Sequence, residues 1–89
     1  MVTLFIRHTA ADYQAWQKAY DNFAPAQRAM GVTAQAVYRG IANPNDVTVT
    51  HEFANLAAAQ LFLISEELKQ AMQSAGVADG PTVWFTTKV

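Results

Sequence analysis

The side chains best suited to acid–base chemistry in this chain are its two histidines, because an imidazole changes its charge near neutral pH. His51 interrupts the segment VTVTHEF, residues 47–53, in which valine and threonine alternate. Alternate side chains of a β-strand point to the same side of a sheet, so His51 shares the side of Val47, Val49 and Phe53. An apolar row of this kind is expected to face a core, and His51 is therefore predicted to be an interior histidine.

His8 continues a similar apolar row in the first segment of the chain, which is formed by Val2, Leu4 and Ile6. If the two segments are neighbouring strands, both histidines can line one crevice and act there as general base, proton relay or ligand donor. A plainer interpretation stays open. In it, His51 is a neutral core residue paired with a tyrosine hydroxyl or a backbone group, and His8 lies in water at the end of a strand.

Other reactive patterns are weaker or missing. A catalytic zinc needs three protein ligands, and Glu52, the carboxylate nearest to His51 in sequence, is predicted to point to the opposite face, so no metal site is expected. The sequence has no cysteine, which excludes disulfide and thiolate chemistry. It also has no Ser-His-Asp, nucleophile-elbow, glycine-rich phosphate or paired-carboxylate pattern. Aromatic candidates for an apolar ligand pocket, with plain core packing as the alternative, are Tyr13, Trp16, Tyr20 and Trp84.

The composition limits the class of protein that can carry these residues. The 89 residues are 52% hydrophobic and 15% charged with a net charge of −1, which predicts one globular domain over residues 1–89 and some apolar surface against a second chain. No basic cluster suggests nucleic acid, and the most apolar run, LAAAQLFLI, is half of a membrane span. We expect a cytoplasmic protein that binds neither nucleic acid nor membranes.

The elements that must position the histidines follow from hydrophobic periodicity and from turn residues. Strands are predicted at residues 2–8, 32–39, 46–53 and 82–89, with the loop VADGP before the last one. Helices are predicted to begin after Asp12, Asn55 and Ser65, and to end at Gly31 and Gly76. Pro25 is expected to kink or break the first helix near Ala24.

This order, βαββαβ, predicts a ferredoxin-like α+β fold: a four-stranded antiparallel sheet with its helices on one face. We expect the first and third strands to lie in the centre, parallel to each other. The other face of the sheet would carry Phe5, Thr48, Thr50 and Glu52. An RNA-recognition module would use that face for stacking on bases, but its aromatic motif is missing from DVTVTHEFA. We therefore predict that two sheets pack face to face in a homodimer.

In its order of elements and in the segment HEFANLAAAQLFLISEELKQAM, residues 51–72, the chain resembles the dimeric α+β barrel proteins that include antibiotic biosynthesis monooxygenases and heme-degrading monooxygenases. The heme-degrading branch has a tryptophan where this chain has Phe53, and an iron-binding histidine where it has Met72. Monooxygenase-type members often carry a histidine where this chain has Phe62. These departures argue against heme and weaken, without removing, a monooxygenase interpretation.

The resemblance implies a small-molecule enzyme of the cofactor-free monooxygenase or cyclase type, acting on an apolar substrate such as a polycyclic aromatic. His51 and His8 are the catalytic candidates, and the aromatic residues above, together with Phe53 and Phe62, are the candidates for ligand contacts. The alternative is a non-catalytic dimeric barrel that binds a small ligand or serves as an assembly module.

Overall fold

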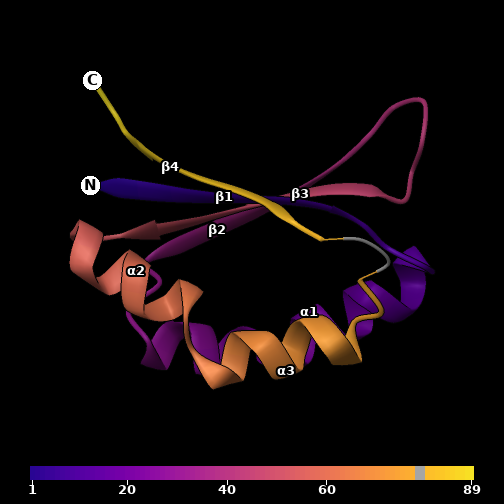
Figure 1. Cartoon of the computed structure of the whole chain (residues 1–89), viewed down its shortest axis with the longest axis horizontal. Helices are drawn as coiled ribbons and strands as arrows, with labels where there is room; N and C mark the ends of the chain where they lie inside the picture. The colour runs from indigo at the N-terminus through magenta and orange to yellow at the C-terminus, as the bar shows by residue number, and fades with distance from the viewer. Residues whose placement is uncertain (78–79) are drawn as a thin grey trace.

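The computed structural model describes residues 1–77 and 80–89, and it contains every element that the sequence predicts (Figure 1). Residues 78 and 79 of the predicted loop VADGP lie outside the described residues. The strands are β1 (Val2–Thr9), β2 (Ala34–Arg39), β3 (Asp46–Phe53) and β4 (Thr82–Thr87). The helices are α1 (Tyr13–Ala29), α2 (Leu56–Leu63) and α3 (Glu66–Ser74).

The four strands form one sheet in the order β2-β3-β1-β4, with every neighbouring pair antiparallel. The ferredoxin-like βαββαβ arrangement is therefore confirmed, and the helices lie together on one side of the sheet (Figure 1). The expectation that β1 and β3 run parallel is wrong. The crossover through α1 makes β2 parallel to β1, and the β2–β3 hairpin, with its loop over residues 40–45, then reverses β3 relative to both.

Each helix begins at the polar residue that the sequence indicated. The carboxylate of Asp12 accepts a hydrogen bond from the backbone N–H of Gln14 at the start of α1. Asn55 and Ser65 cap α2 and α3 in the same way. Such caps pair N–H groups that have no partner inside the helix, each worth about 1 kcal/mol.

The expected break at Pro25 does not occur, because α1 continues through it to Ala29. A proline inside a helix removes one backbone hydrogen bond. On either side of it, however, Phe23 and Gln27 are buried against the rest of the protein. Packing on both sides of the proline thus holds the helix in one piece.

The two faces of the sheet differ in what covers them. The face toward the helices carries the buried strand residues of the core, which are Leu4, Ile6, Val47, Val49 and Phe53. The opposite face, here called the open face, has no element of the described chain over it (Figure 1). On it Phe5 and Trp84 stack with ring centroids 5.0 Å apart, and Tyr38 is 58% exposed.

Candidate functional site

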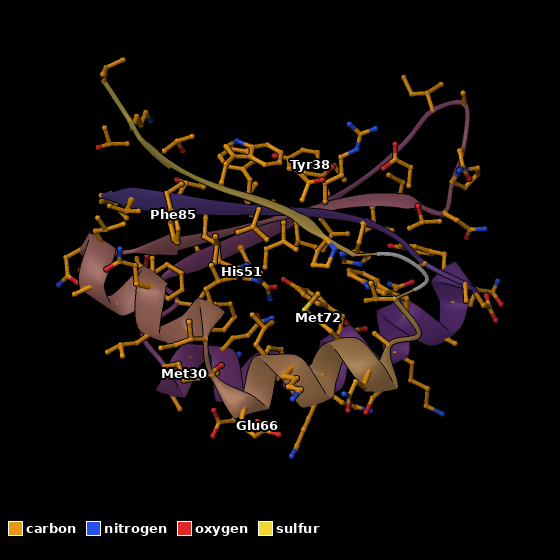
Figure 2. The ribbon with its side chains drawn as sticks, viewed as in Figure 1. Met30, Tyr38, His51, Glu66, Met72 and Phe85 are labelled. Carbon is orange, nitrogen blue, oxygen red and sulfur yellow. The ribbon has the colours of Figure 1, made fainter. Side chains whose placement is uncertain are left out.

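His51 points from β3 into the layer between the sheet and the helices, as its strand alternation predicts (Figure 2). Only 1% of its surface is exposed, and its neighbours across the sheet are Leu4 on β1 and Gln35 on β2. A valine at this position would fill the same space without a polar atom. His51 therefore brings an ionisable group into an apolar layer.

One ring nitrogen of His51 has polar partners, and both come from α1. The hydroxyl of Tyr20 lies 2.9 Å from Nε2, and the amide nitrogen of Gln27 lies 3.5 Å from the same atom. Tyr20 and Gln27 are seven positions apart, close to two full helical turns, so they lie on the same face of α1. The other ring nitrogen, Nδ1, has no hydrogen-bond partner among the described residues.

Gln27 is the member of this group that sequence analysis missed. It is 1% exposed, and its Oε1 atom is buried without a partner among the described residues. A glutamine is usually a surface residue, so only its position relative to Phe23 and Tyr20 could have suggested that it faces the core.

Burial controls the ionisation of His51 and Tyr20. It lowers the pKa of His51 to about 4, because the charged imidazolium would lose its hydration inside the protein. Burial also raises the pKa of Tyr20 to about 12, although a hydrogen bond with Gln27 acts in the opposite direction. At pH 7, His51 is therefore a neutral imidazole and Tyr20 a neutral phenol.

His8 does not meet His51. The register pairs His8 with Val47 and His51 with Leu4, which separates the histidines by four positions along β1, or about 13 Å at the usual strand rise. The antiparallel direction of β3 causes this separation. His8 is nevertheless 5% exposed, so the interpretation that placed it in water is wrong as well.

Two stacked aromatic rings on α1 bridge the space between the histidines. The ring centroid of Trp16 lies 5.7 Å from that of His8 and 4.8 Å from that of Tyr20. Both histidines also line one small cavity of about 30 Å³, with Trp16 and Tyr20 in its wall. The structure thus brings the predicted residues to one cavity, although at different ends of it.

A larger groove adjoins this cavity. It has a volume of about 450 Å³ and lies between β1 and β4 on one side and α2 and α3 on the other. Ile6, Leu68 and Met72 line both the groove and the small cavity. Met72 projects from α3 toward the sheet in the region next to His51 (Figure 2). These three apolar side chains are all that the two spaces share.

Three of the other predicted ligand contacts are Tyr13, Phe53 and Phe62. Tyr13 stacks on Trp16 with its centroid 5.7 Å away, and its ring lies under the guanidinium of Arg39 at 3.6 Å. Phe53 and Phe62 are fully buried and pack against each other, and Phe62 also packs against His51 with ring centroids 5.0 Å apart.

Trp84 requires a correction, because it lies on the open face and not in the crevice. It pairs with Phe5 across the sheet and shares the side of that residue. In β4 the residues that face the helices are its neighbours Val83 and Phe85, which pair with Ile6 and Leu4.

Within residues 1–77 and 80–89, no group of three or more histidine, cysteine, aspartate or glutamate side chains is arranged to hold a metal ion. No helix of the same described part is long and apolar enough to cross a membrane.

Comparison with solved structures identifies the fold. The chain superposes on a protein assigned as an antibiotic biosynthesis monooxygenase from Bordetella bronchiseptica with a TM-score of 0.85 and 17% identity, over 99% of this chain and 96% of the other. For a similarly assigned protein from Deinococcus radiodurans the TM-score is 0.76 at 20% identity, over 100% and 93% of the two chains. SnoaB, a cofactor-independent oxygenase from Streptomyces nogalater, gives 0.82 at 12% identity, over 99% and 92%.

The sequence itself matches no protein-family model and no curated protein. The predicted resemblance is confirmed at the level of the fold, which is the ferredoxin-like fold of the antibiotic biosynthesis monooxygenase-like proteins. Identities of this size leave the chemistry to be argued from the site, because one fold hosts many reactions.

Proposed function

We propose that this chain is a small-molecule enzyme of the cofactor-free monooxygenase or cyclase type, with its reaction at the cavity that His51 and His8 line. The observation that carries the proposal is the state of His51. It is buried, neutral at pH 7, held at Nε2 by Tyr20, and without a partner at Nδ1 among the described residues. A core histidine kept only for packing would be expected to have both ring nitrogens paired.

The chemistry follows from that arrangement. In the tautomer that carries its proton on Nε2, His51 donates this proton to the oxygen of Tyr20. The amide of Gln27, which can only donate through its nitrogen, then donates to the same oxygen. Nδ1 keeps a lone pair that can accept a proton from a substrate. The substrate anion left behind is rich in electrons. In the oxygenase case it reduces O₂ directly, so that a CH₂ group and O₂ become C=O and H₂O with every electron supplied by the substrate.

Access to His51 comes from the groove. The small cavity has room for about one water molecule, so a substrate must displace the side chains that separate the two spaces. Leu68 and Met72 form this separation on α3. Methionine is unbranched and adapts its shape readily, which suits a side chain that moves when a ligand enters.

The small size of the cavity favours a second candidate function, a non-catalytic protein that binds a ligand in the groove alone.

Measurements of oxygen uptake distinguish the enzyme from the non-catalytic protein. Wild-type protein and the variant His51→Leu are compared on a panel of polycyclic phenols and anthrones, with Lys18→Gln on the outer side of α1 as the control. We expect His51→Leu to lose about 10²- to 10⁴-fold of the rate while it keeps its circular dichroism spectrum. Equal rates in wild type and His51→Leu would refute a catalytic role for His51.

The open face supports the proposal of a homodimer. The stacked pair of Phe5 and Trp84 and the exposed Tyr38 form an aromatic surface, and aromatic residues are enriched where protein surfaces meet. Thr50 lies on the same face, where it pairs with Phe5 and Ala36 across the sheet.

Sedimentation at micromolar concentration tests the homodimer. The wild type should sediment as a dimer, and Thr50→Arg should be monomeric because it buries an unpaired charge in the interface. Lys18→Gln serves as the matched surface variant that stays dimeric. A wild-type monomer would refute the assembly.

A further inference from the structure

The groove between α3 and β4 has one feature that the chemistry at His51 does not use. Most of its wall is apolar, and this part consists of Ile6, Leu63, Ile64, Leu68, Met72, Val77, Pro81 and Val83. Its polar lining residues are Ser65, Lys69 and Gln73, one or two helical turns apart on α3 and its cap. An apolar trough with polar groups along one side fits a ligand that is itself divided into an apolar and a polar part.

Lys69 carries the only charge among the described residues of this wall. Ser65 is already engaged, because its hydroxyl donates to the carbonyl of Phe62 and accepts from the N–H of Leu68. Within residues 1–77 and 80–89 the single ion pair joins Arg7 and Asp46, so no carboxylate there neutralises Lys69. Among the described residues, the groove therefore combines an apolar floor with a positive charge at its rim that no carboxylate pairs with.

Neighbouring carboxylates do not reverse this sign. Glu66 takes a hydrogen bond from Gln70 on the exposed side of α3, and it points away from the sheet (Figure 2). Glu67 lines a separate hollow between α1 and α3. Neither is among the residues that line the groove.

We propose that the groove binds an amphiphilic anion, whose apolar body lies between α3 and β4 and whose carboxylate or similar group pairs with Lys69. The proposal rests on the proposed function, since it names the substrate class of the same site. The volume of the groove, about 450 Å³, falls within the usual range for small-molecule pockets, roughly 300 to 1,000 Å³. The anionic end at the rim would leave the opposite end of the ligand near Leu68 and Met72, next to the cavity of His51.

Two fluorescent dyes that differ in a single charged group test this proposal. They are 1-anilinonaphthalene-8-sulfonate, which is an anion, and N-phenyl-1-naphthylamine, which is its neutral counterpart. Both are titrated at pH 7 against wild type, Lys69→Gln, Lys69→Glu and the control Lys18→Gln. Gln73→Trp is the blocking variant, because residue 73 is exposed on α3 and a large ring there fills the groove without disturbing the core.

Lys69→Gln should weaken binding of the anionic dye about three- to fivefold, the size expected for one ion pair at a surface, and leave the neutral dye unchanged. Lys69→Glu should weaken the anionic dye further, Lys18→Gln should change neither dye, and Gln73→Trp should weaken both. Equal responses of the two dyes to Lys69→Gln would overturn the anionic part and leave the apolar groove in place. If neither dye binds, or if Gln73→Trp leaves the binding of both dyes unchanged, the groove is not a binding site. The oxygen-uptake comparison of wild type and His51→Leu does not depend on either result.

Discussion

The buried state of His51 predicts how the stability of the protein depends on pH. In the unfolded chain the pKa of a histidine is about 6.5, whereas in the folded protein burial lowers the pKa of His51 to about 4. Between these values the unfolded state binds a proton that the folded state does not, so acid favours unfolding. The stability tied to this group is fully present above pH 6.5 and is lost as the pH falls toward 4.

The magnitude follows from the same two values. A difference of about 2.5 units, at 1.36 kcal/mol per unit, is about 3 kcal/mol of unfolding free energy. A domain of this size has about 5 to 10 kcal/mol in total, so the loss is a large part of its stability. Other groups also titrate below pH 5, among them Asp46, whose pKa is lowered by its hydrogen bond with Arg7. The measurement must therefore isolate His51.

Urea unfolding at a fixed protein concentration, followed by the fluorescence of Trp16 and Trp84, provides that measurement. Wild type is compared at pH 7, 5.5 and 4 with His51→Leu and with His51→Gln, which keeps a polar group but does not titrate. The carboxylates are the same in all of these chains and cancel in the difference. We expect wild type to lose about 3 kcal/mol relative to either variant between pH 7 and pH 4. If the unfolding free energies of wild type and variants change equally between pH 7 and pH 4, the assignment of His51 as a buried neutral imidazole is wrong.

Three further predictions concern local structure, each measured by urea unfolding at pH 7. Gly31→Ala should lower the unfolding free energy by about 1 to 2 kcal/mol, because Gly31 has φ of +98°. Gly80→Ala is the control: a Cβ at residue 80 meets no atom within 4 Å, so the unfolding free energy should change by less than about 0.5 kcal/mol. Ser65→Ala should cost about 1 kcal/mol by removing the cap of α3, and no change would show that the helix does not need it. Tyr20→Phe should cost about 1 to 2 kcal/mol because it removes the hydroxyl that pairs with His51, and a neutral result would indicate that water replaces the hydroxyl.

Strand alternation was enough to predict that His51 lies inside. The side of a sheet that a residue faces depends only on the parity of its position, which is local information. The helix starts at Asp12, Asn55 and Ser65 were predictable for the same reason, since a cap acts within three residues. Elements and faces are therefore what this sequence determines most directly.

Relations between distant segments were harder to predict. The distance between His8 and His51 depends on the direction and register of β1 against β3, which no pattern within either strand encodes. Trp84 was assigned to the wrong side because its neighbours Val83 and Phe85 are apolar too, so the alternation within β4 does not show which side faces the core. The register against β1, where Trp84 pairs with Phe5, shows it. Gln27 was missed because glutamine is usually a surface residue, although its position relative to Tyr20 and Phe23 places it on the buried face of α1.

The pairing of β1 with β4 has a consequence for how the protein folds. Val2 pairs with Thr87, and the hydroxyl of Thr87 donates to the carbonyl of Met1, so the two ends of the chain lie together (Figure 1). Contacts between residues so far apart in sequence close a very long loop, and proteins rich in such contacts fold slowly. Until β4 arrives, β1 is an unpaired edge able to bind a strand from another molecule. Docking of β4 therefore both completes the sheet and covers this edge of β1.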